Sequence, residues 1–470
     1  MFLYSDSDVR SIDEAAIRDY HITALQLQES AAMLLYNALI NHIQKKDKGV
    51  VVVGRGNNGA DGLALSRMLF IAGFDISIYY LTDEDGSAEY EAQKEIVSTL
   101  GLKVVSHLDG FDYLIDALIG VGCKKDLKPE VIDVINSINS LDLKVFSLDM
   151  PTGVGFNSNA KECIKAQYTF TLGVSKAAMY LKGNRAYCGD IKVLTPLFPL
   201  TEKVKGVAKL VDIDSLSLKK FLPNAYKKTR GDLIIVGSSK EYPSTVLLSS
   251  RAAFSSGIGL VTIYTDKEVA PKLYNENPAL MVRPFSDFKA DDKAVLLLGP
   301  GLGSSNDDVL LPFLKLENKK VVDADGIRAY SRLYKEGRIG RLTNAIMTPH
   351  LGELKALLDA FGLSSGDTPN TYLESIKKLA LLTGATLVVK SEVASITDGD
   401  KVNIVDLVNP SLAVAGSGDV LASVIAVLYV NDDKAALTGV LLHKKAGIDA
   451  QLKYGYYSAL ELIEAIGQNR

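Results

Sequence analysis

Cysteine is scarce in this chain of 470 residues, which contains only Cys123, Cys163 and Cys188. They show no C-x-x-C spacing, which argues against a disulfide framework and favours a reducing compartment, the cytoplasm. Long apolar runs are scarce as well. The longest apolar helix candidate, residues 420–430, is about half of the ~20 residues that cross a bilayer. The first residues lack a basic stretch followed by an apolar core, so we expect no signal peptide.

Neither sign of charge dominates, since 56 acidic residues face 52 basic ones and leave a net charge of −4. Such a balance gives no global attraction to nucleic acid or to an anionic membrane, so we expect neither as a partner. Low-complexity segments and short-period repeats are also absent. A hydrophobic content of 47% with 23% charged residues is typical of a globular protein, and the length predicts two or three domains.

The first 205 residues alternate between strand-like and helix-like segments. This alternation predicts a mostly parallel sheet covered on both faces, a doubly wound, Rossmann-like α/β domain over residues 1–205. The predicted helices are residues 11–43, 61–73 and 89–101, and the predicted strands are residues 49–54, 76–81, 103–108, 112–120, 144–150 and 168–173.

A connection carrying Pro196, Pro199 and Pro223 follows, and the alternation then restarts. We predict a second α/β domain over residues 206–470, with a long helix beginning at Asp419. Its predicted strands are residues 231–239, 260–265, 294–301, 320–325, 345–350 and 386–391.

The loop GRGNNGADG, residues 54–62, has the G-x-G-x-x-G spacing of a dinucleotide-binding turn. Such a turn brings backbone N–H groups close to a phosphate at a helix N-terminus. A Rossmann cofactor site would also have an acid at the end of the second strand, and Asp83 or Glu84 fits that position. The alternative is a tight structural turn, because the spacing alone is a weak signal.

Acidic residues follow two further strands of the first half. Asp116 precedes a loop with Gly120 and Gly122, and Asp149 precedes Pro151, Thr152 and Gly153. The carboxyl ends of parallel strands line one crevice, so we expect Asn58, Asp61, Asp116, Asp149 and Thr152 to converge there. This oxygen-rich set suits a hard monovalent or divalent cation instead of zinc, and Asp149 is a candidate for proton transfer. Alternatively, each acid caps a helix or fixes a turn.

The stretch AGSGD, residues 415–419, is the strongest pattern in the second half. Free N–H groups at the start of the following helix can hold a transferring phosphoryl group, and Asp419 can accept a proton from the attacking hydroxyl. The glycine loop 299–305, the acids of DADGI at 323–327, His350 and Lys390 also follow strand-like runs. A plain helix cap is the alternative for Asp419, and a structural role is the alternative for His350 and Lys390.

The first-half motifs GRGNNGADG, DALIGVG and DMPTGV, in this order, resemble the NAD(P)H-hydrate epimerase domain. The resemblance implies that Asn58, Asp116 and Thr152 hold a potassium ion and that Asp149 is catalytic. Ala60 stands where the family has glycine, which would matter if that residue needs a positive φ. The residues implied to bind the hydrated dinucleotide are Asn57, Asn58, Gly59, Ala60, Asp61, Gly120, Val121, Gly122, Cys123, Lys124, Lys125, Asp126 and Asp149.

The second half, from about residue 227 onward, resembles the ADP/ATP-dependent NAD(P)H-hydrate dehydratases, which have a ribokinase-like fold. The resemblance implies that Asp419 activates the C6 hydroxyl of the hydrate for phosphoryl transfer from ADP or ATP, with Mg²⁺. It implies Thr245, Gly301, Gly303, His350 and Asp419 at the hydrate. It places Lys390, Ser391, Glu392, Val393, Ala394 and Gly418 at the nucleotide, and it implies a homo-oligomer.

Three other functions remain open from the residues alone. A ribokinase-like vitamin or sugar kinase with a nucleotide-binding N-terminal module would also carry the GSGD pattern. The first half could serve as a non-enzymatic nucleotide sensor. A hydride-transferring dehydrogenase is less favoured, because no second substrate site with a paired His and Arg is visible.

Overall fold

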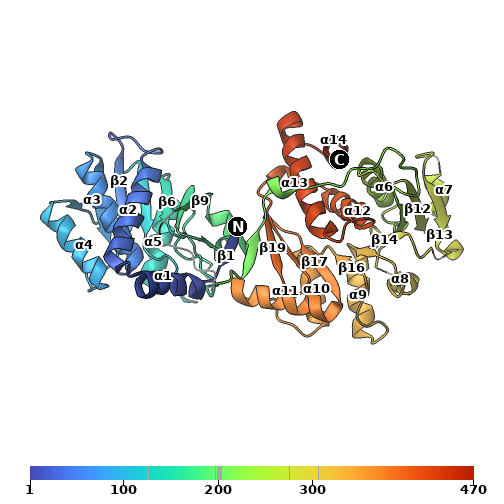
Figure 1. Ribbon diagram of the computed structural model, residues 1–470, viewed down its shortest axis with the longest axis horizontal. Coiled ribbons are helices and arrows are strands. Elements are labelled where there is room, and N and C mark those ends of the chain that lie inside the picture. Colours follow the sequence, from blue (N-terminus) through green and yellow to red (C-terminus); the bar gives the residue numbers. More distant parts are fainter. Residues whose placement is uncertain are drawn as a thin grey trace. The chain divides into compact units, whose positions relative to one another are not determined.

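The computed structural model describes residues 1–470 except 124, 125, 160, 196, 198–203, 275, 290 and 305. Contacts between Cα atoms divide the chain into two compact units (Figure 1). The first unit contains Met1–Lys209 and Gly366–Tyr372, and the second contains Leu210–Ser365 and Leu373–Arg470. Among the described residues, no helix is both long and apolar enough to cross a membrane.

A seven-stranded sheet forms the centre of the first unit, and all neighbouring strands in it are parallel. The order reverses between β2 and β5, which creates a crevice at the carboxyl ends of these strands. The order is β4 (Lys103–Val104), β3 (Asp75–Tyr80), β2 (Lys48–Val53), β5 (Tyr113–Ala117), β6 (Lys144–Leu148), β7 (Tyr168–Leu172) and β9 (Asp190–Leu194).

Helices cover both faces of this sheet, as its uninterrupted apolar strands require. Val51 and Val53 of β2 pack in one core with α2, α3 and α4, while Val50 and Val52 pack in another with α5. Three short strands of this unit pair separately: β1 (Phe2–Tyr4) is antiparallel to β10 (Ala208–Leu210) and parallel to β8 (Ser175–Lys176). The helices are α1 (Asp6–Tyr20), α2 (Ala24–Leu39), α3 (Asn57–Ile71), α4 (Ala88–Thr99) and α5 (Pro129–Ser140).

The segment predicted as helical over residues 11–43 is divided into two helices, α1 and α2. His21 adopts a left-handed conformation with φ 57°, and Thr23 then caps α2 in a reciprocal box with Gln26. A Thr followed three residues later by Gln is a helix-start pattern that apolar periodicity alone does not reveal. The strand predicted over residues 103–108 is also shorter, since β4 contains only Lys103 and Val104.

The second unit is built on strands in the order β13 (Met281–Pro284), β12 (Leu260–Thr265), β11 (Asp232–Val236), β14 (Val295–Leu298), β15 (Lys320–Val322), β16 (Ala345–Met347), β17 (Ala385–Val389), β18 (Val393–Thr397) and β19 (Val402–Asp406). Pairing is parallel from β13 to β17 and antiparallel from β17 to β19. The strand order reverses between β11 and β14.

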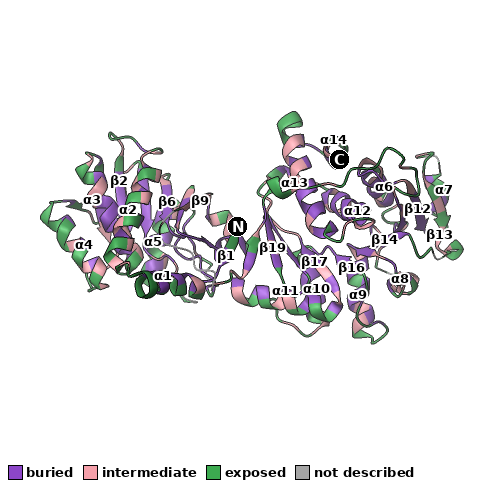
Figure 2. Ribbon diagram, in the orientation of Figure 1, coloured by how far each residue is buried: buried purple, intermediate pink, exposed green. Residues whose placement is uncertain are grey.

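Two helical layers flank this sheet (Figure 1). One layer packs α6, α12, α13 and α14 against the core, and the burial colouring shows α12 as almost wholly buried (Figure 2). The other layer contains α8 to α11. The helices are α6 (Thr245–Ser255), α7 (Ala270–Leu273), α8 (Asp307–Leu314), α9 (Asp325–Lys335), α10 (Leu351–Ala360), α11 (Pro369–Thr383), α12 (Ser417–Tyr429), α13 (Ala435–Tyr454) and α14 (Ala459–Asn469).

Candidate functional sites

A cavity of about 850 Å³ opens at the carboxyl ends of β2 and β5 in the first unit. It lies where the strand order reverses, the usual ligand position in an open parallel sheet. Its lining joins the glycine loop after β2, the loop after β5, Asp149 after β6 and the inner face of α1. The predicted residues on its wall are Asn57, Asn58, Asp61, Gly120, Val121, Gly122, Asp126 and Asp149.

The innermost polar feature of the cavity is an ion pair between Asp149 and Lys176. Lys176 is fully buried, and its Nζ lies 2.5 Å from Asp149 Oδ1, 2.7 Å from Leu172 O and 2.9 Å from Thr171 Oγ1. These three partners match the three N–H donors of an ammonium group. Asp149 itself has φ 65°, a conformation that a non-glycine residue holds only under constraint and that often marks functional sites.

Two further carboxyl groups, those of Asp61 and Asp13, share this cavity wall. Burial raises the pKa of Asp61 well above its usual value, and the charges of Asp149 and Asp13 raise it further. Burial also raises the pKa of Asp13, to about 6, while Lys176 opposes the increase. The cavity therefore contains carboxyl groups of different proton affinity around a single buried ammonium, an arrangement suited to moving protons.

Asp116 and Thr152, two of the three predicted potassium ligands, are in direct contact. Thr152 donates to Asp116 through its hydroxyl (2.7 Å) and its backbone N–H (2.9 Å), and Ser147 donates at 2.8 Å. Burial raises the pKa of Asp116, and these hydrogen bonds lower it. Among the described residues, the donors that reach the Asp116 carboxylate are neutral hydroxyl and backbone N–H groups, so a monovalent cation would fit this oxygen-rich position.

Asn58, the third predicted ligand, converges with Asp149 on Gly120. A Cβ placed on Gly120 would lie 3.1 Å from Asp149 Oδ2 and 3.2 Å from Asn58 Oδ1. Within the described chain, the buried Asn58 Nδ2 has no hydrogen-bond partner. The amide oxygen and nitrogen exchange places by a rotation, so this side chain can present an oxygen to a cation or its N–H₂ to a ligand.

The glycine loop has no space for a side chain at Gly59, whereas the side chain of Ala60 fits without backbone strain. A Cβ on Gly59 would lie 1.7 Å from Gly54 O, so no larger residue fits. Ala60 lies in the first turn of α3, outside the residues with positive φ, and its methyl group is buried in the core that contains α2, α3 and α4. The expected conflict at Ala60 does not arise, because this position is helical.

Replacing Ala60 by glycine should destabilise the first unit by about 1–2 kcal/mol, from lost helix propensity and lost methyl burial. The epimerisation rate should remain close to that of the unmodified chain. Thermal unfolding of A60G and of A64G, a fully buried alanine one turn later in α3, should give similar losses. A large gain of epimerisation in A60G alone would show that the methyl group restricts the site.

Three other residues of the first unit were predicted to bind the hydrated dinucleotide: Cys123, Lys124 and Lys125. Cys123 is buried beside Gly155 instead of lining the cavity. Lys124 and Lys125 lie outside the described residues.

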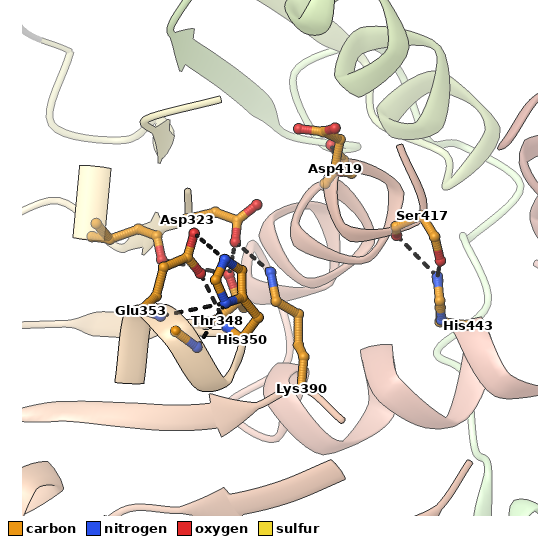
Figure 3. Close-up of polar contacts among 11 residues, drawn as sticks. Asp323, Thr348, His350, Glu353, Lys390, Ser417, Asp419 and His443 are labelled. Carbon is orange, nitrogen blue, oxygen red and sulfur yellow. Dashed lines mark hydrogen bonds and ion pairs between the residues drawn. The ribbon is translucent and has the colours of Figure 1, made fainter. Parts of the chain in front are cut away.

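In the second unit, the carboxyl ends of β15, β16 and β17 bring an acid, a hydroxyl and an ammonium together (Figure 3). Asp323 Oδ1 accepts from Thr348 Oγ1 at 2.6 Å and from Lys390 Nζ at 2.8 Å. Burial opposes the charge of Lys390, but Asp323, with Glu353 and Asp419 beyond it, raises its pKa above the usual value. Lys390 is therefore a fixed cation.

The N-terminus of α12 faces this cation. A Cβ placed on Gly418 would lie 3.5 Å from Lys390 Nζ. The helix begins after Gly416, whose φ of 87° favours glycine, and Asp419 stands in its first turn. Burial raises the pKa of Asp419 to about 7, with Asp323 raising it further and Lys390 lowering it. Free N–H groups, a lysine and a carboxylate with a pKa of about 7 form an arrangement that suits phosphoryl transfer.

His350 follows β16 and is the N-cap residue of α10. Its Nδ1 accepts from Gly352 N at 2.9 Å, while its Nε2 lies 3.3 Å from Glu353 Oε1. The structural role considered from the sequence is thus present. Half of the His350 side chain remains exposed, so its ring can still contact a ligand.

The loops after β11 and β14 adjoin each other at the reversal of strand order. A Cβ on Gly301, which has φ 61°, would lie 2.7 Å from Thr245 Oγ1, and Gly303 N donates to Asp325 Oδ2 at 2.8 Å. Thr245, Gly301 and Gly303 thus come together as predicted residues of one site. The turn between β17 and β18 contains Ser391, whose Oγ donates to Val393 O, and exposed Glu392; Val393 and Ala394 are buried in β18.

Four residues of these sites were not among the predicted ligands: Lys176, Asp13, Asp323 and His443. Asp323 belongs to the DADGI acids that the sequence analysis noted. His443 lies on α13, and its Nε2 is 3.1 Å from Ser417 O and 3.2 Å from Ser417 Oγ (Figure 3). Burial lowers the pKa of His443 to about 4, so it braces the start of α12 as a neutral ring.

Residues 233–468 match the family model described as NAD(P)H-hydrate dehydratase. The chain belongs to this family. Residues 24–178 match the family model described as YjeF-related protein N-terminus. The predicted family, the α/β fold class of both halves and the enzymatic nature of the chain are thereby confirmed.

Relatives of the family extend the likeness over nearly the whole chain. The bifunctional NAD(P)H-hydrate repair enzyme Nnr of Coxiella burnetii is 27% identical over 94% of this chain and 94% of its own length. A ribokinase-like superfamily protein from Enterococcus faecalis is 24% identical, covers 56% of this chain and 94% of its own, and has a TM-score of 0.48. An ADP/ATP-dependent NAD(P)H-hydrate dehydratase from Bacillus subtilis, co-crystallised with ATP/Mg²⁺, is 23% identical, covering 56% and 97%, with a TM-score of 0.47.

Proposed function

We propose that this chain repairs hydrated nicotinamide cofactors at two sites. The first unit interconverts the R and S forms of NAD(P)H-hydrate, and the second unit dehydrates the S form back to NAD(P)H with ADP or ATP. The observation that carries the proposal is the pairing of Lys390 with the N-terminus of α12, where Asp419 has a pKa of about 7. Family membership directs this phosphoryl-transfer chemistry to the hydrate.

In the dehydratase site, Asp419 accepts the proton of the C6 hydroxyl as its oxygen attacks the terminal phosphoryl group of the nucleotide. The N–H groups at the start of α12 and the Lys390 ammonium offset the charge of that group. The transferred phosphate then leaves with the C6 oxygen, C5 loses a proton, and the dihydropyridine double bond is restored. Thr245, Gly301, Gly303 and the exposed ring of His350 adjoin the hydrate, and residues 390–394 with Gly418 adjoin the nucleotide.

In the epimerase site, the configuration at C6 inverts without net gain or loss of a proton. Asp149 exchanges a proton with the reacting hydrate, and Lys176 orients the Asp149 carboxylate through their ion pair. Asn58, Asp116 and Thr152 would hold a potassium ion, which would supply positive charge beside the carboxylates of this site. Magnesium would enter the second site with the nucleotide.

The test is a hydrate assay on the full chain. Purified S-hydrate with ADP or ATP should regain the near-ultraviolet absorbance of the reduced cofactor and release free phosphate. R-hydrate should do so only after potassium-dependent epimerisation. A stable phosphorylated product without recovered absorbance would instead support the ribokinase-like vitamin or sugar kinase. The cytoplasmic location and the homo-oligomeric state remain predictions from the sequence.

The pH dependence of dehydration should follow Asp419. This carboxyl must be ionised to accept a proton, and its pKa is about 7, so kcat/KM should decrease tenfold for each pH unit below about 7 and level off above it. Asp323 raises the pKa of Asp419 and Lys390 lowers it, so D323N, which removes the acid and leaves the lysine, should shift the acidic limb to lower pH. An acidic limb that stays in place in D323N would contradict this assignment.

A further inference from the structure

The rim of the first cavity carries an exposed ion pair at the end of β3. Arg55 Nη1 lies 2.5 Å from Glu84 Oε2, and both residues line the cavity. Arg55 belongs to the glycine loop after β2, and Glu84 follows the neighbouring parallel strand β3. In a β–glycine loop–helix–β unit, this strand end lies beside the 2′ position of the adenosine ribose. An acid there binds the free 2′-hydroxyl, and an arginine there accepts a 2′-phosphate.

The backbone holds Arg55 at this strand end. Ser87 N donates to Arg55 O at 3.0 Å, and Leu81 N donates to Val53 O at 3.2 Å, so the loops after β2 and β3 are joined on both sides of the pair. A Cβ on Gly86 would lie 2.4 Å from Arg55 O, so the two loops lie too close together for any side chain at residue 86. Glu84 N donates to Thr82 Oγ1 at 3.2 Å, which fixes the turn after β3, and both residues line the cavity.

While the backbone of these loops is held by hydrogen bonds, the side chains of Arg55 and Glu84 are exposed and can exchange partners. About half of the Arg55 side chain and 61% of the Glu84 side chain are exposed. Exposed ion pairs contribute little stability, so a phosphate dianion that offers bidentate hydrogen bonds can displace Glu84 from Arg55. When the 2′ position carries only a hydroxyl, Glu84 can accept its hydrogen bond while Arg55 remains close by.

We propose that Arg55 and Glu84 determine how the epimerase site treats the 2′ position of the hydrated cofactor. Arg55 admits the phosphate of NADPH-hydrate, and Glu84 favours the free hydroxyl of NADH-hydrate. This inference rests on the proposed epimerase function and specifies its substrate class. The pair makes the first site able to use both hydrates, with two opposed residues that set the ratio between them.

The test compares kcat/KM for epimerisation of NADPH-hydrate and NADH-hydrate by the full chain, without ADP or ATP, so that the second site does not turn over. R55A should lower the NADPH-hydrate value about tenfold relative to the NADH-hydrate value, and this loss should diminish in high salt. E84Q should change the ratio about tenfold in the opposite direction, because it replaces the charged acceptor of the 2′-hydroxyl by a weaker neutral one and removes the anion that competes for Arg55.

Two control variants, K128A and E130Q, remove one positive and one negative charge, as R55A and E84Q do, but from another part of the cavity lining. Lys128 and Glu130 also line the cavity, on and just before α5, and form their own 3.5 Å ion pair. K128A and E130Q should affect the two hydrates equally. A ratio that stays constant in R55A and E84Q, or that shifts equally in K128A, would overturn the inference and leave the epimerase function standing.

Failure of the epimerase function would be visible separately, as absence of R–S exchange with both hydrates in the unmodified chain. In that case, calorimetric titration of the unmodified chain, R55A and E84Q with each hydrate still decides the inference. A loss of affinity in R55A that is confined to NADPH-hydrate supports it, and equal affinities of all three proteins for NADPH-hydrate contradict it.

Discussion

Replacing Asp419 by asparagine should lower the rate of ADP- or ATP-dependent dehydration at least about a hundredfold, the usual contribution of a positioned general base. Asparagine keeps the size of the side chain and the position of α12, but it cannot accept the proton of the attacking hydroxyl. The measurement is the recovery of near-ultraviolet absorbance from S-hydrate at saturating nucleotide. The epimerisation rate should be unchanged, because Asp149 and Lys176 lie in the other unit.

Asp433 offers a matched control for this variant. Its side chain is almost fully exposed in the turn between α12 and α13, so D433N makes the same change of charge close to the same helix without touching the site. D433N should dehydrate the hydrate as fast as the unmodified chain. If D419N does so as well, Asp419 is only a helix-capping residue, and another group must accept the proton.

Replacing Lys176 by methionine should lower epimerisation at least about a hundredfold. The loss removes the cation that faces Asp149 and that lowers the pKa of Asp13 and Asp61. Leaving a buried carboxylate without its partner also costs stability, about 3–5 kcal/mol in comparable buried pairs. The measurements are the R–S exchange rate and the thermal unfolding of the first unit.

Several readouts separate chemistry from folding in this variant. Dehydration of S-hydrate should persist in K176M, since the second unit has its own core. The double variant K176M/D149N should regain stability, because no charge is left unpaired, yet should remain inactive as an epimerase. K192M, which changes an exposed lysine on β9, should leave both properties unchanged. Epimerisation at the normal rate in a folded K176M would show that Lys176 has only a structural role.

The glycine and acid patterns predicted much of both sites because they depend on local geometry. Asp116 lies near the end of β5, and Asn58, Asp149 and Thr152 follow other strands of the same parallel sheet, so the fold itself brings them to one edge. The same reason applies to the second unit, where Gly301, His350 and Lys390 follow β14, β16 and β17. Ala60 could not be judged this way, because only the backbone conformation shows that α3 already includes it.

By itself, the sequence determined two α/β domains, the edge of each sheet that carries chemistry, and the residue types available there. The tertiary structure decided which of these residues form pairs. Lys176 lies 27 residues beyond Asp149, and Lys390 lies 67 residues beyond Asp323, so no local pattern joins them. The parallel strands β15, β16 and β17 bring Asp323 and Lys390 to one sheet edge, whereas Lys176 reaches Asp149 from the separate short strand β8. Burial of these pairs makes each charge dependent on its partner.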